Sequence, residues 1–271
     1  VPLDWDMYAS TSTFKVQPSK FGEASMRLKN RIKKTDQLPM FAYFSDGFPH
    51  VTKETKLSEK EMSLRNLGYL GWNEETAYSD IWINRLTKIW TLWDRANRTI
   101  DGEKKALANC ETFKAQGIVN DEEYNEDIKL HKSRLENAER EKFRYDNEVQ
   151  AIRNCLIKFS QGDKNIEVTD FFVSVYEESG LCLQTRDGSN PSFIKLPAGY
   201  KRLFFMVLDI AYRSLLLSNG STTDLAGIVV IDEIDLHLHP ELEQSVLARF
   251  RKTFPRVQFI ISTHSPLVLS G

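Results

Sequence analysis

Two apolar runs near the C-terminal end of this 271-residue chain stop abruptly at polar residues. The first run ends at Ile231 and is followed by Asp232 and Glu233, and the second ends at Ile261 and is followed by Ser262. In a parallel α/β sheet, a buried strand delivers its terminal polar residues to the carboxyl edge, where ligands bind. The two runs therefore predict strands that bring chemically useful side chains to the edge of a sheet.

The segment between the two runs predicts a helix. Pro240 stands at a favoured first helical position, two glutamates follow in the first turns, and Pro255 ends the segment. A strand–helix–strand unit with apolar strands implies two parallel strands in one sheet that is covered on both faces. We therefore expect an α/β fold with a parallel sheet flanked by helices.

Asp232, Glu233 and His264 are the candidate catalytic residues of this edge. One carboxylate can hold Mg²⁺ through water while its neighbour orients or deprotonates an attacking water, so we assign Asp232 to the metal and Glu233 to the water. A neutral imidazole at His264 can hydrogen-bond a γ-phosphate or position the same water. Each feature alone also fits a strand that leaves the core through a polar turn, whereas the two strand ends together favour a site.

Asp235, His237 and His239 follow in the same loop and allow two interpretations. Imidazole and carboxylate suit zinc, but no fourth ligand is evident and Pro240 begins a helix at once. A structural loop at a subunit boundary is the favoured interpretation.

Residues 196–200 (Leu-Pro-Ala-Gly-Tyr) form a small-residue turn that leads into a helix ending near Leu217. The backbone N–H groups and the dipole at a helix N-terminus attract anions, and Lys201 and Arg202 add positive charge. Many helices begin with a glycine turn. The position of this turn, just before the acidic strand, makes it a candidate phosphate site.

The middle of the chain predicts two long helices, because no proline occurs between Pro49 and Pro191. Apolar or small residues recur there at alternating steps of four and three in two series, interrupted at Glu103 and Lys142. Residues 117–121 (Gly-Ile-Val-Asn-Asp) break the pattern and offer a new helix N-cap. We expect an antiparallel, coiled-coil-like hairpin whose arms of about 37 residues extend roughly 55 Å. Two ordinary helices of a bundle are the alternative.

The other elements are less regular. A helix over 21–34 and a buried strand over 38–44 precede the hairpin, and strands over 166–176 and 181–185 follow it. The chain begins Val-Pro without methionine and stops just after the polar loop, so we expect a segment of a longer protein.

Composition is that of an ordinary globular protein, with 36 basic and 38 acidic residues and a net charge of −2. This balance does not support a nucleic-acid or membrane surface as partner, although a local basic patch would still fit. Three scattered cysteines without a C-x-x-C pair favour a reducing compartment. No signal peptide or bilayer-length apolar run is present, so we expect a cytoplasmic protein that does not enter the membrane.

Two stretches carry a family resemblance: 227–240 (Gly-Ile-Val-Val-Ile-Asp-Glu-Ile-Asp-Leu-His-Leu-His-Pro) and 261–266 (Ile-Ser-Thr-His-Ser-Pro). They resemble the Walker B and switch-histidine motifs of ABC-class AAA ATPases, the RecF-, SMC- and OLD-like group. Within this group the chain most resembles the PtuA-type ATPases of Septu and retron-linked anti-phage defence. The turn at 196–201 resembles the signature L-S-x-G-x-[RK], with Pro197 in place of the serine, which removes a phosphate-binding hydroxyl.

The resemblance implies ATP and Mg²⁺ as cofactors, with Asp232 on the metal, Glu233 activating water and His264 sensing the γ-phosphate. Asp235 to His239 would form the D-loop across a dimer seam. The signature residues that would contact ATP held by the other subunit are Leu196, Ala198, Gly199, Tyr200 and Lys201. Two ATP molecules would be sandwiched in a head-to-tail homodimer or higher oligomer.

No G-x-x-x-x-G-K-[ST] phosphate-binding loop occurs in the 271 residues, so this loop would lie upstream of Val1. Residues 1–79 would then be part of the ATPase lobe and a connecting segment, and 80–160 a helical-hairpin insertion. Residues 161–271 would be the lobe that carries the signature, Walker B, D-loop and switch histidine.

The expected function is ATP hydrolysis that controls a partner effector, a nuclease in anti-phage defence. Two alternatives remain. One is a nucleotide-gated scaffold with little turnover, and the other is a DNA-clamp or repair ATPase of the SMC and RecF kind, which the charge balance does not support.

Overall fold

The computed structural model of the protein describes residues 37–47, 65–69, 79–174, 176 and 180–270, so the helix expected over 21–34 lies outside the described residues. The elements are, in chain order, strand β1 (Met40–Phe44), 3-10 helix η1 (Arg65–Tyr69), helices α3 (Ser79–Ala115) and α4 (Asp121–Ser160), strands β2 (Val168–Val173) and β3 (Leu181–Thr185), 3-10 helix η2 (Phe193–Lys195), helix α5 (Ala198–Leu217), strand β4 (Gly227–Ile231), helix α6 (Pro240–Thr253), strand β5 (Val257–Ile261) and helix α7 (Pro266–Ser270). None of the described helices is long and apolar enough to span a bilayer.

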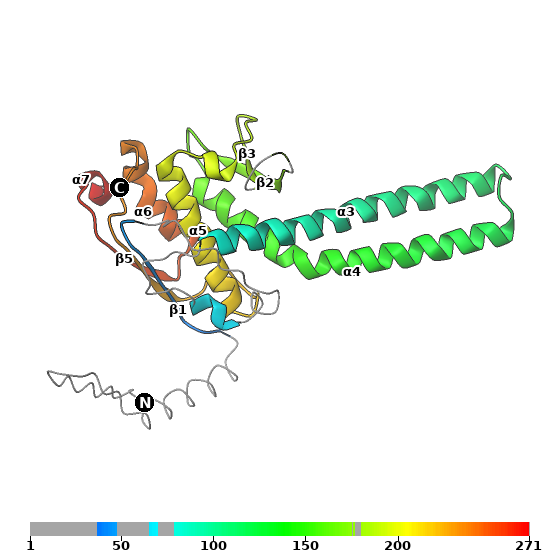
Figure 1. The fold of residues 1–271 in the computed structure, drawn as a ribbon, viewed down its shortest axis with the longest axis horizontal. Coiled ribbons are helices and arrows are strands. Elements are labelled where there is room, and N and C mark those ends of the chain that lie inside the picture. The colour runs from blue at the N-terminus through cyan, green and yellow to red at the C-terminus, as the bar shows by residue number, and fades with distance from the viewer. Residues whose placement is uncertain (1–36, 48–64, 70–78, 175, 177–179, 271) are drawn as a thin grey trace, which may run out of the picture. The chain divides into compact units, whose positions relative to one another are not determined.

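Strands β1, β4 and β5 form a parallel sheet in the order β1–β4–β5, which confirms the predicted α/β fold (Figure 1). The register places their last residues, Phe44, Ile231 and Ile261, at one level. Because the three strands run the same way, the segments that follow them leave from one edge. Strands β2 and β3 pair antiparallel in a separate two-stranded sheet, and β2 is shorter than the strand expected over 166–176.

One face of the parallel sheet is buried under α5 and α6. Helix α5 contacts β1, and the Phe250 ring of α6 lies 5.4 Å from the Phe259 ring of β5. On the opposite face Ile260 keeps 50% of its surface exposed and Phe41 keeps 36%. Tyr69 of η1 packs on Phe41 at this face, with ring centroids 6.5 Å apart, so the described residues cover this face only in part. The apolar runs predict buried strands, but they do not indicate how much of each face the other elements cover.

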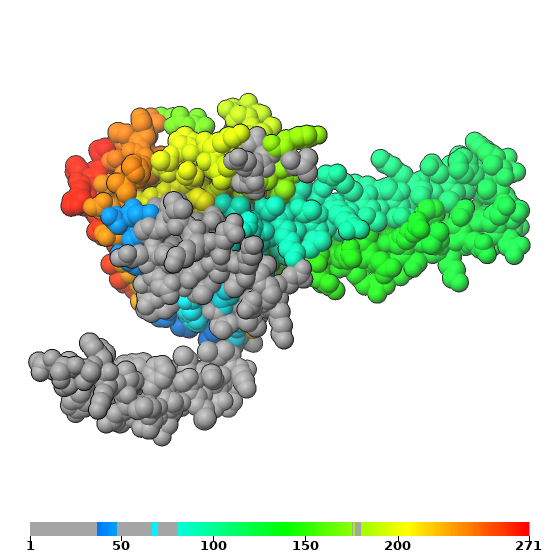
Figure 2. All heavy atoms as spheres, viewed as in Figure 1, coloured from blue at the N-terminus to red at the C-terminus, as the bar shows by residue number. Residues whose placement is uncertain are grey.

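Helices α3 and α4 form the predicted antiparallel hairpin and lie side by side along their length (Figures 1 and 2). They contain 37 and 40 residues. Leu86 and Val149, one from each apolar series, are fully buried. At Glu103, where the first series is interrupted, the carboxylate Oε2 lies 2.5 Å from the Nδ1 atom of His131 on the opposite helix. A polar contact thus replaces an apolar one at this step of the hairpin.

Asn120 is the N-cap of α4, as the break in the sequence pattern predicts. Its side-chain oxygen accepts the backbone N–H groups of Glu122 and Glu123 at 3.0 and 2.9 Å, and the Glu123 carboxylate accepts the N–H of Asn120 at 3.3 Å. This reciprocal capping box satisfies N–H groups that have no partner within the helix. The turn between the helices is therefore specified by local chemistry.

Helix α5 connects the sheet to the root of the hairpin through buried polar contacts. The indole Nε1 of Trp82 donates to Asp209 at 2.5 Å, and the Trp82 ring stacks on Tyr212 with centroids 5.1 Å apart. Arg213 pairs with Asp209 and donates to the carbonyl of Gly68 at 3.0 Å. Elements distant in sequence thus share one packed core around α5.

Replacing Asn120 with alanine removes the acceptor of two N–H groups at the start of α4. Loss of such a cap costs about 1 kcal/mol, a factor of about five in local opening. We expect the amides of residues 121–126 to exchange with solvent faster by that factor, measured by hydrogen exchange and mass spectrometry. Asn125→Ala, at an exposed position in the same helix, is the control. Equal acceleration in both variants would show that the cap does not hold this end.

Candidate functional site

The carboxyl edge of the parallel sheet brings together one residue from each of two strand ends. The Nε2 atom of His264, after β5, lies 3.6 Å from the Oε1 atom of Glu233, after β4. The His264 side chain is 85% exposed and that of Glu233 is 37% exposed. Both groups therefore face solvent, where a ligand can reach them, and a carboxylate beside an imidazole can accept a proton from a bound water.

The backbone at Glu233 is strained. Its φ angle is +46°, in the left-handed region that is unfavourable for a residue with a Cβ atom. The strand end of β5 holds this bend, because the N–H of Glu233 donates to the hydroxyl of Ser262 at 2.9 Å and the N–H of Ile234 donates to the Ser262 carbonyl at 3.2 Å. Such strain persists where the surroundings over-determine it, commonly at functional sites.

Ser262 also donates its hydroxyl hydrogen to the Asp232 carboxylate. It stood inside the motif after β5 but was not itself among the predicted site residues. The serine directly after an apolar run was the signal that could have identified it. Asp232, Ser262 and Glu233 carry side-chain oxygen atoms, and oxygen is the ligand type that Mg²⁺ prefers. The residues of this edge therefore fit magnesium chemically.

Asp235 points back to the segment after β5. Its carboxylate accepts the Thr263 hydroxyl at 2.5 Å and the backbone N–H of His264 at 3.3 Å. Burial acts to raise the pKa of Asp235, but these hydrogen bonds and the nearby His264 outweigh it and hold that pKa below the ordinary value. These hydrogen bonds connect the loop after β4 to the segment after β5.

His237 and His239 are both exposed. The Nδ1 atom of His239 accepts the backbone N–H of Glu241 at 3.4 Å and caps α6. Across the described ranges, no cluster of three or more His, Cys, Asp or Glu side chains is arranged to hold a metal. The zinc interpretation of Asp235 with these two histidines therefore has no geometric support.

The turn at 196–201 lies directly against this loop. A Cβ atom on Gly199 would come within 2.5 Å of the carbonyl oxygen of His237, so only glycine allows this approach. Helix α5 begins at Ala198, and Pro197 provides no side-chain cap for its first N–H groups. Ala198 is exposed, Lys201 is half-buried and Leu196 is buried. The predicted signature residues and the predicted D-loop are thus neighbours within one chain.

Arg202 is buried, with 1% of its surface exposed, beneath the loop that contains Glu233. Its guanidinium donates to the carbonyl oxygens of Glu233 at 2.6 Å and Asp232 at 2.8 Å. From the sequence, Arg202 was predicted only to add positive charge near the start of a helix. An arginine directly before the apolar run 203–208 was the signal of a buried role.

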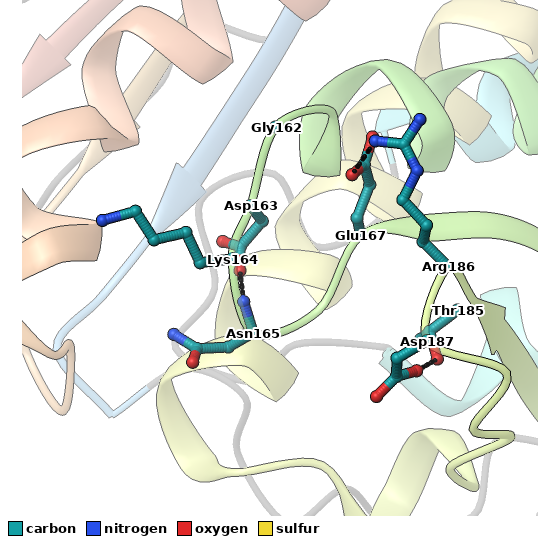
Figure 3. Close-up of a pocket in the computed structure, with 8 residues that line it drawn as sticks. All are labelled: Gly162, Asp163, Lys164, Asn165, Glu167, Thr185, Arg186 and Asp187. Carbon is teal, nitrogen blue, oxygen red and sulfur yellow. Dashed lines mark hydrogen bonds and ion pairs between the residues drawn. The ribbon is translucent and has the colours of Figure 1, made fainter.

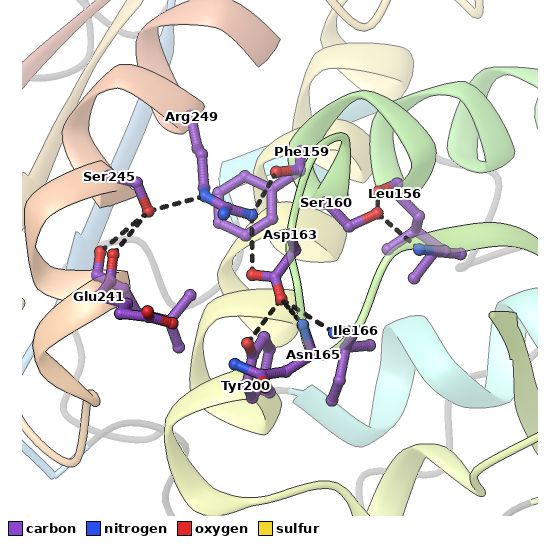
Figure 4. Close-up of polar contacts among 12 residues, drawn as sticks. Leu156, Phe159, Ser160, Asp163, Asn165, Ile166, Tyr200, Glu241, Ser245 and Arg249 are labelled. Carbon is purple, nitrogen blue, oxygen red and sulfur yellow. Dashed lines mark hydrogen bonds and ion pairs between the residues drawn. The ribbon is translucent and has the colours of Figure 1, made fainter. Parts of the chain in front are cut away.

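The Tyr200 side chain lies in a polar network around Asp163 (Figure 4). Its hydroxyl donates to Asp163 Oδ1 at 2.8 Å, and burial together with this carboxylate raises the pKa of Tyr200 to about 12. Asp163 also pairs with Arg249 of α6 at 3.0 Å, and Arg249 donates to Ser245 at 2.9 Å and to the Phe159 carbonyl at 3.4 Å. The network joins the end of α4 and the loop before β2 to the first turn of α5 and to α6.

A cavity of about 450 Å³ lies beside this network (Figure 3). It is lined by Gly162, Asp163, Lys164, Asn165, Glu167, Thr185, Arg186 and Asp187. None of the predicted site residues is among them. Its charged groups are already engaged, as in the ion pair between Arg186 and Glu167 at 2.8 Å, and it is separate from the candidate site at the sheet edge.

Comparison with known proteins supports an ATPase segment. Residues 195–270 match the family described as "AAA domain, putative AbiEii toxin, Type IV TA system". The chain is 48% identical over 87 residues to "Retron Vc95 probable ATPase" of Vibrio cholerae serotype O1 biovar El Tor, which covers 31% of this chain and 17% of that protein. It is 48% identical over 79 residues to "Retron Ec83 probable ATPase" of Escherichia coli, a match that covers 28% of this chain and 15% of that protein. It is 40% identical over 76 residues to "Septu protein PtuA" of Bacillus mycoides strain KBAB4, a match that covers 28% of this chain and 10% of that protein.

The matched segment thus spans less than a fifth of the length of these relatives. Among solved structures, the Smc head domain of Pyrococcus furiosus with an extended coiled coil, bound to the C-terminal domain of ScpA, aligns with a TM-score of 0.30 and 14% identity over 69% of this chain and 51% of that chain. The resemblance to AAA-class ATPases that the motifs predict is confirmed over residues 195–270.

Replacing Thr263 with valine removes the hydroxyl that donates to Asp235. We expect the pKa of Asp235 to rise toward its ordinary value near about 4. Because the pKa of Asp235 is lower in the folded than in the unfolded protein, its ionised form stabilises the fold at pH values above the unfolded-state pKa. This stabilisation is lost as the pH falls through the folded-state pKa, and the loss should be smaller in the variant. A carboxyl NMR titration measures the pKa. In Ser265→Ala, which removes a hydroxyl bonded to Glu243 instead, the Asp235 titration should stay unchanged; an unchanged titration in Thr263→Val would contradict the assignment.

Proposed function

We propose that this chain is part of an ATPase that hydrolyses ATP to control a partner effector, because residues 195–270 match an AAA domain. The observation that carries the proposal is the 3.6 Å approach between the Glu233 carboxylate and the His264 imidazole at the end of a parallel sheet. Two accessible groups able to orient and deprotonate one water are what phosphoryl transfer to water requires.

Each residue of the edge has a proposed part in this reaction. Asp232, oriented by the Ser262 hydroxyl, would hold the metal, and Glu233 would act as the general base toward the attacking water. His264 would contact the γ-phosphate and place the water between itself and Glu233. When bound, Mg²⁺ supplies positive charge that offsets the negative charge of the phosphates.

The signature turn and the D-loop favour a site completed by a second subunit. The Gly199 backbone lies against the His237 carbonyl, so the two segments form one continuous surface. In the proposed arrangement this surface faces the ATP held by the other subunit of a head-to-tail dimer. The arrangement also requires a phosphate-binding loop, and residues 80–160 would serve as the insertion that contacts the effector.

A role in anti-phage defence, with a nuclease as effector, is the biological form of this proposal. It is supported by the names of the relatives, which are retron ATPases and a Septu protein. In a nucleotide-gated scaffold the same residues would bind ATP with little turnover. In a DNA clamp the affinity for DNA would fall steeply with salt, because phosphate contacts release counterions.

The central test is Glu233→Gln in the full-length protein. The amide keeps the size and polarity of the side chain but cannot accept the proton, so we expect ATP binding to persist while steady-state hydrolysis falls at least about 100-fold. Glu139→Gln, at an exposed position of α4, is the control and should hydrolyse ATP as the parent does.

Three outcomes count against the proposal in different ways. Unchanged turnover in Glu233→Gln removes Glu233 from the general-base role. ATP binding without measurable hydrolysis in the parent protein favours the scaffold. Tight, strongly salt-dependent DNA binding favours the clamp.

A further inference from the structure

Arg202 is a cation in an apolar setting. It is the fifth residue of α5, its neighbours Leu203, Phe204 and Phe205 are buried, and only 1% of its own surface is exposed. Burial of a guanidinium is unfavourable unless its N–H groups find acceptors, and burial accordingly acts to lower the pKa of Arg202. The hydrogen-bond acceptors around its guanidinium therefore account for the burial of this arginine.

The acceptors are main-chain carbonyl oxygens at the sheet edge. Nη1 donates to Glu233 at 2.6 Å and to Ile234 at 3.4 Å, and Nη2 donates to Asp232 at 2.8 Å and to Ser45 at 3.3 Å. Three of these carbonyls belong to consecutive residues. One planar fork thus contacts the backbone of the loop after β4 and, through Ser45, the loop after β1.

These carbonyls surround a strained residue of the edge. Glu233 has a φ angle of +46°, which a side-chain-bearing residue adopts only when its surroundings hold it there. Ser262 holds the N–H side of this bend, and Arg202 holds the carbonyl side. The guanidinium also lies within electrostatic reach of Asp46, Asp232, Glu233 and Asp235, where its charge offsets the repulsion among the four carboxylates.

We propose that Arg202 is a positioning residue that fixes the left-handed bend at Glu233 and so aims its carboxylate toward His264. This inference deepens the proposed function and rests on it. Lysine cannot replace the arginine, because an ammonium is a point charge that does not match several carbonyls with a planar fork. The loop would then relax, and the distance between Glu233 and His264 would no longer be set.

The first experiment compares Arg202→Lys with the parent in the full-length protein. We expect the amides of residues 232–236 to exchange at least about tenfold faster, while those of α6 change little. We also expect kcat for ATP to fall about tenfold or more, with a smaller change in KM. Arg213→Lys, which alters a second buried arginine of α5 at the far end of the helix, is the control. It should lower Tm without this local exchange or a kcat-selective loss.

A second experiment separates positioning from simple core filling. Glycine adopts the left-handed backbone freely, so in the Glu233→Gly background Arg202→Lys should lower Tm less than it does in the parent. The Tm loss from Arg213→Lys should be the same in both backgrounds. If Arg202→Lys does not fold in the parent, it should fold in the glycine background.

Equal Tm losses for Arg202→Lys in both backgrounds, failure to fold in both, or unchanged exchange at residues 232–236 would overturn the proposal. These exchange and melting measurements do not need ATP turnover. A parent protein without ATPase activity would therefore refute the proposed function. The role of Arg202 in the bend would still be tested by the exchange and melting measurements.

Discussion

The parallel register of β4 and β5 is the constraint on which the candidate site depends. It ends the two strands together at Ile231 and Ile261, so the polar residues that follow them meet at one edge. A slip of two residues would preserve the alternation of faces but would displace one strand end by about 6.6 Å, beyond contact between Glu233 and His264. The hydrogen bonds of Ser262 to the loop after β4 secure this register where the strands stop.

Helix α5 places the edge and the hairpin root in the same packed unit. At its first turns Arg202 contacts the loop after β4, and further along Asp209 and Arg213 contact Trp82 of α3 and the carbonyl of Gly68. Both ends use buried charge, which is stable only when its hydrogen bonds are made. The helix is therefore fixed by specific polar contacts as well as by its apolar surface.

The sequence was informative where the signal is local. The turn that leads into α5, the start of α6 and the last residues of β4 and β5 follow from a glycine turn, a proline and two apolar runs, and the structure has them there. Contacts between distant segments left no such pattern. Asp163 meets Tyr200 and Arg249 across 37 and more residues, and Glu103, which reads as a break in an apolar series, is matched by His131 on the other helix. The partial exposure of the second face of the sheet could not be predicted either, because strand hydrophobicity does not indicate which elements cover each face.

A crystal structure of the full-length protein with Mn²⁺ and a non-hydrolysable ATP analogue would show directly where the nucleotide binds, with the metal located by its anomalous scattering. We expect the metal beside the Asp232 carboxylate and the γ-phosphate next to both Glu233 and His264. A nucleotide bound elsewhere, with Glu233 and His264 turned apart and neither near a phosphate, would contradict this expectation.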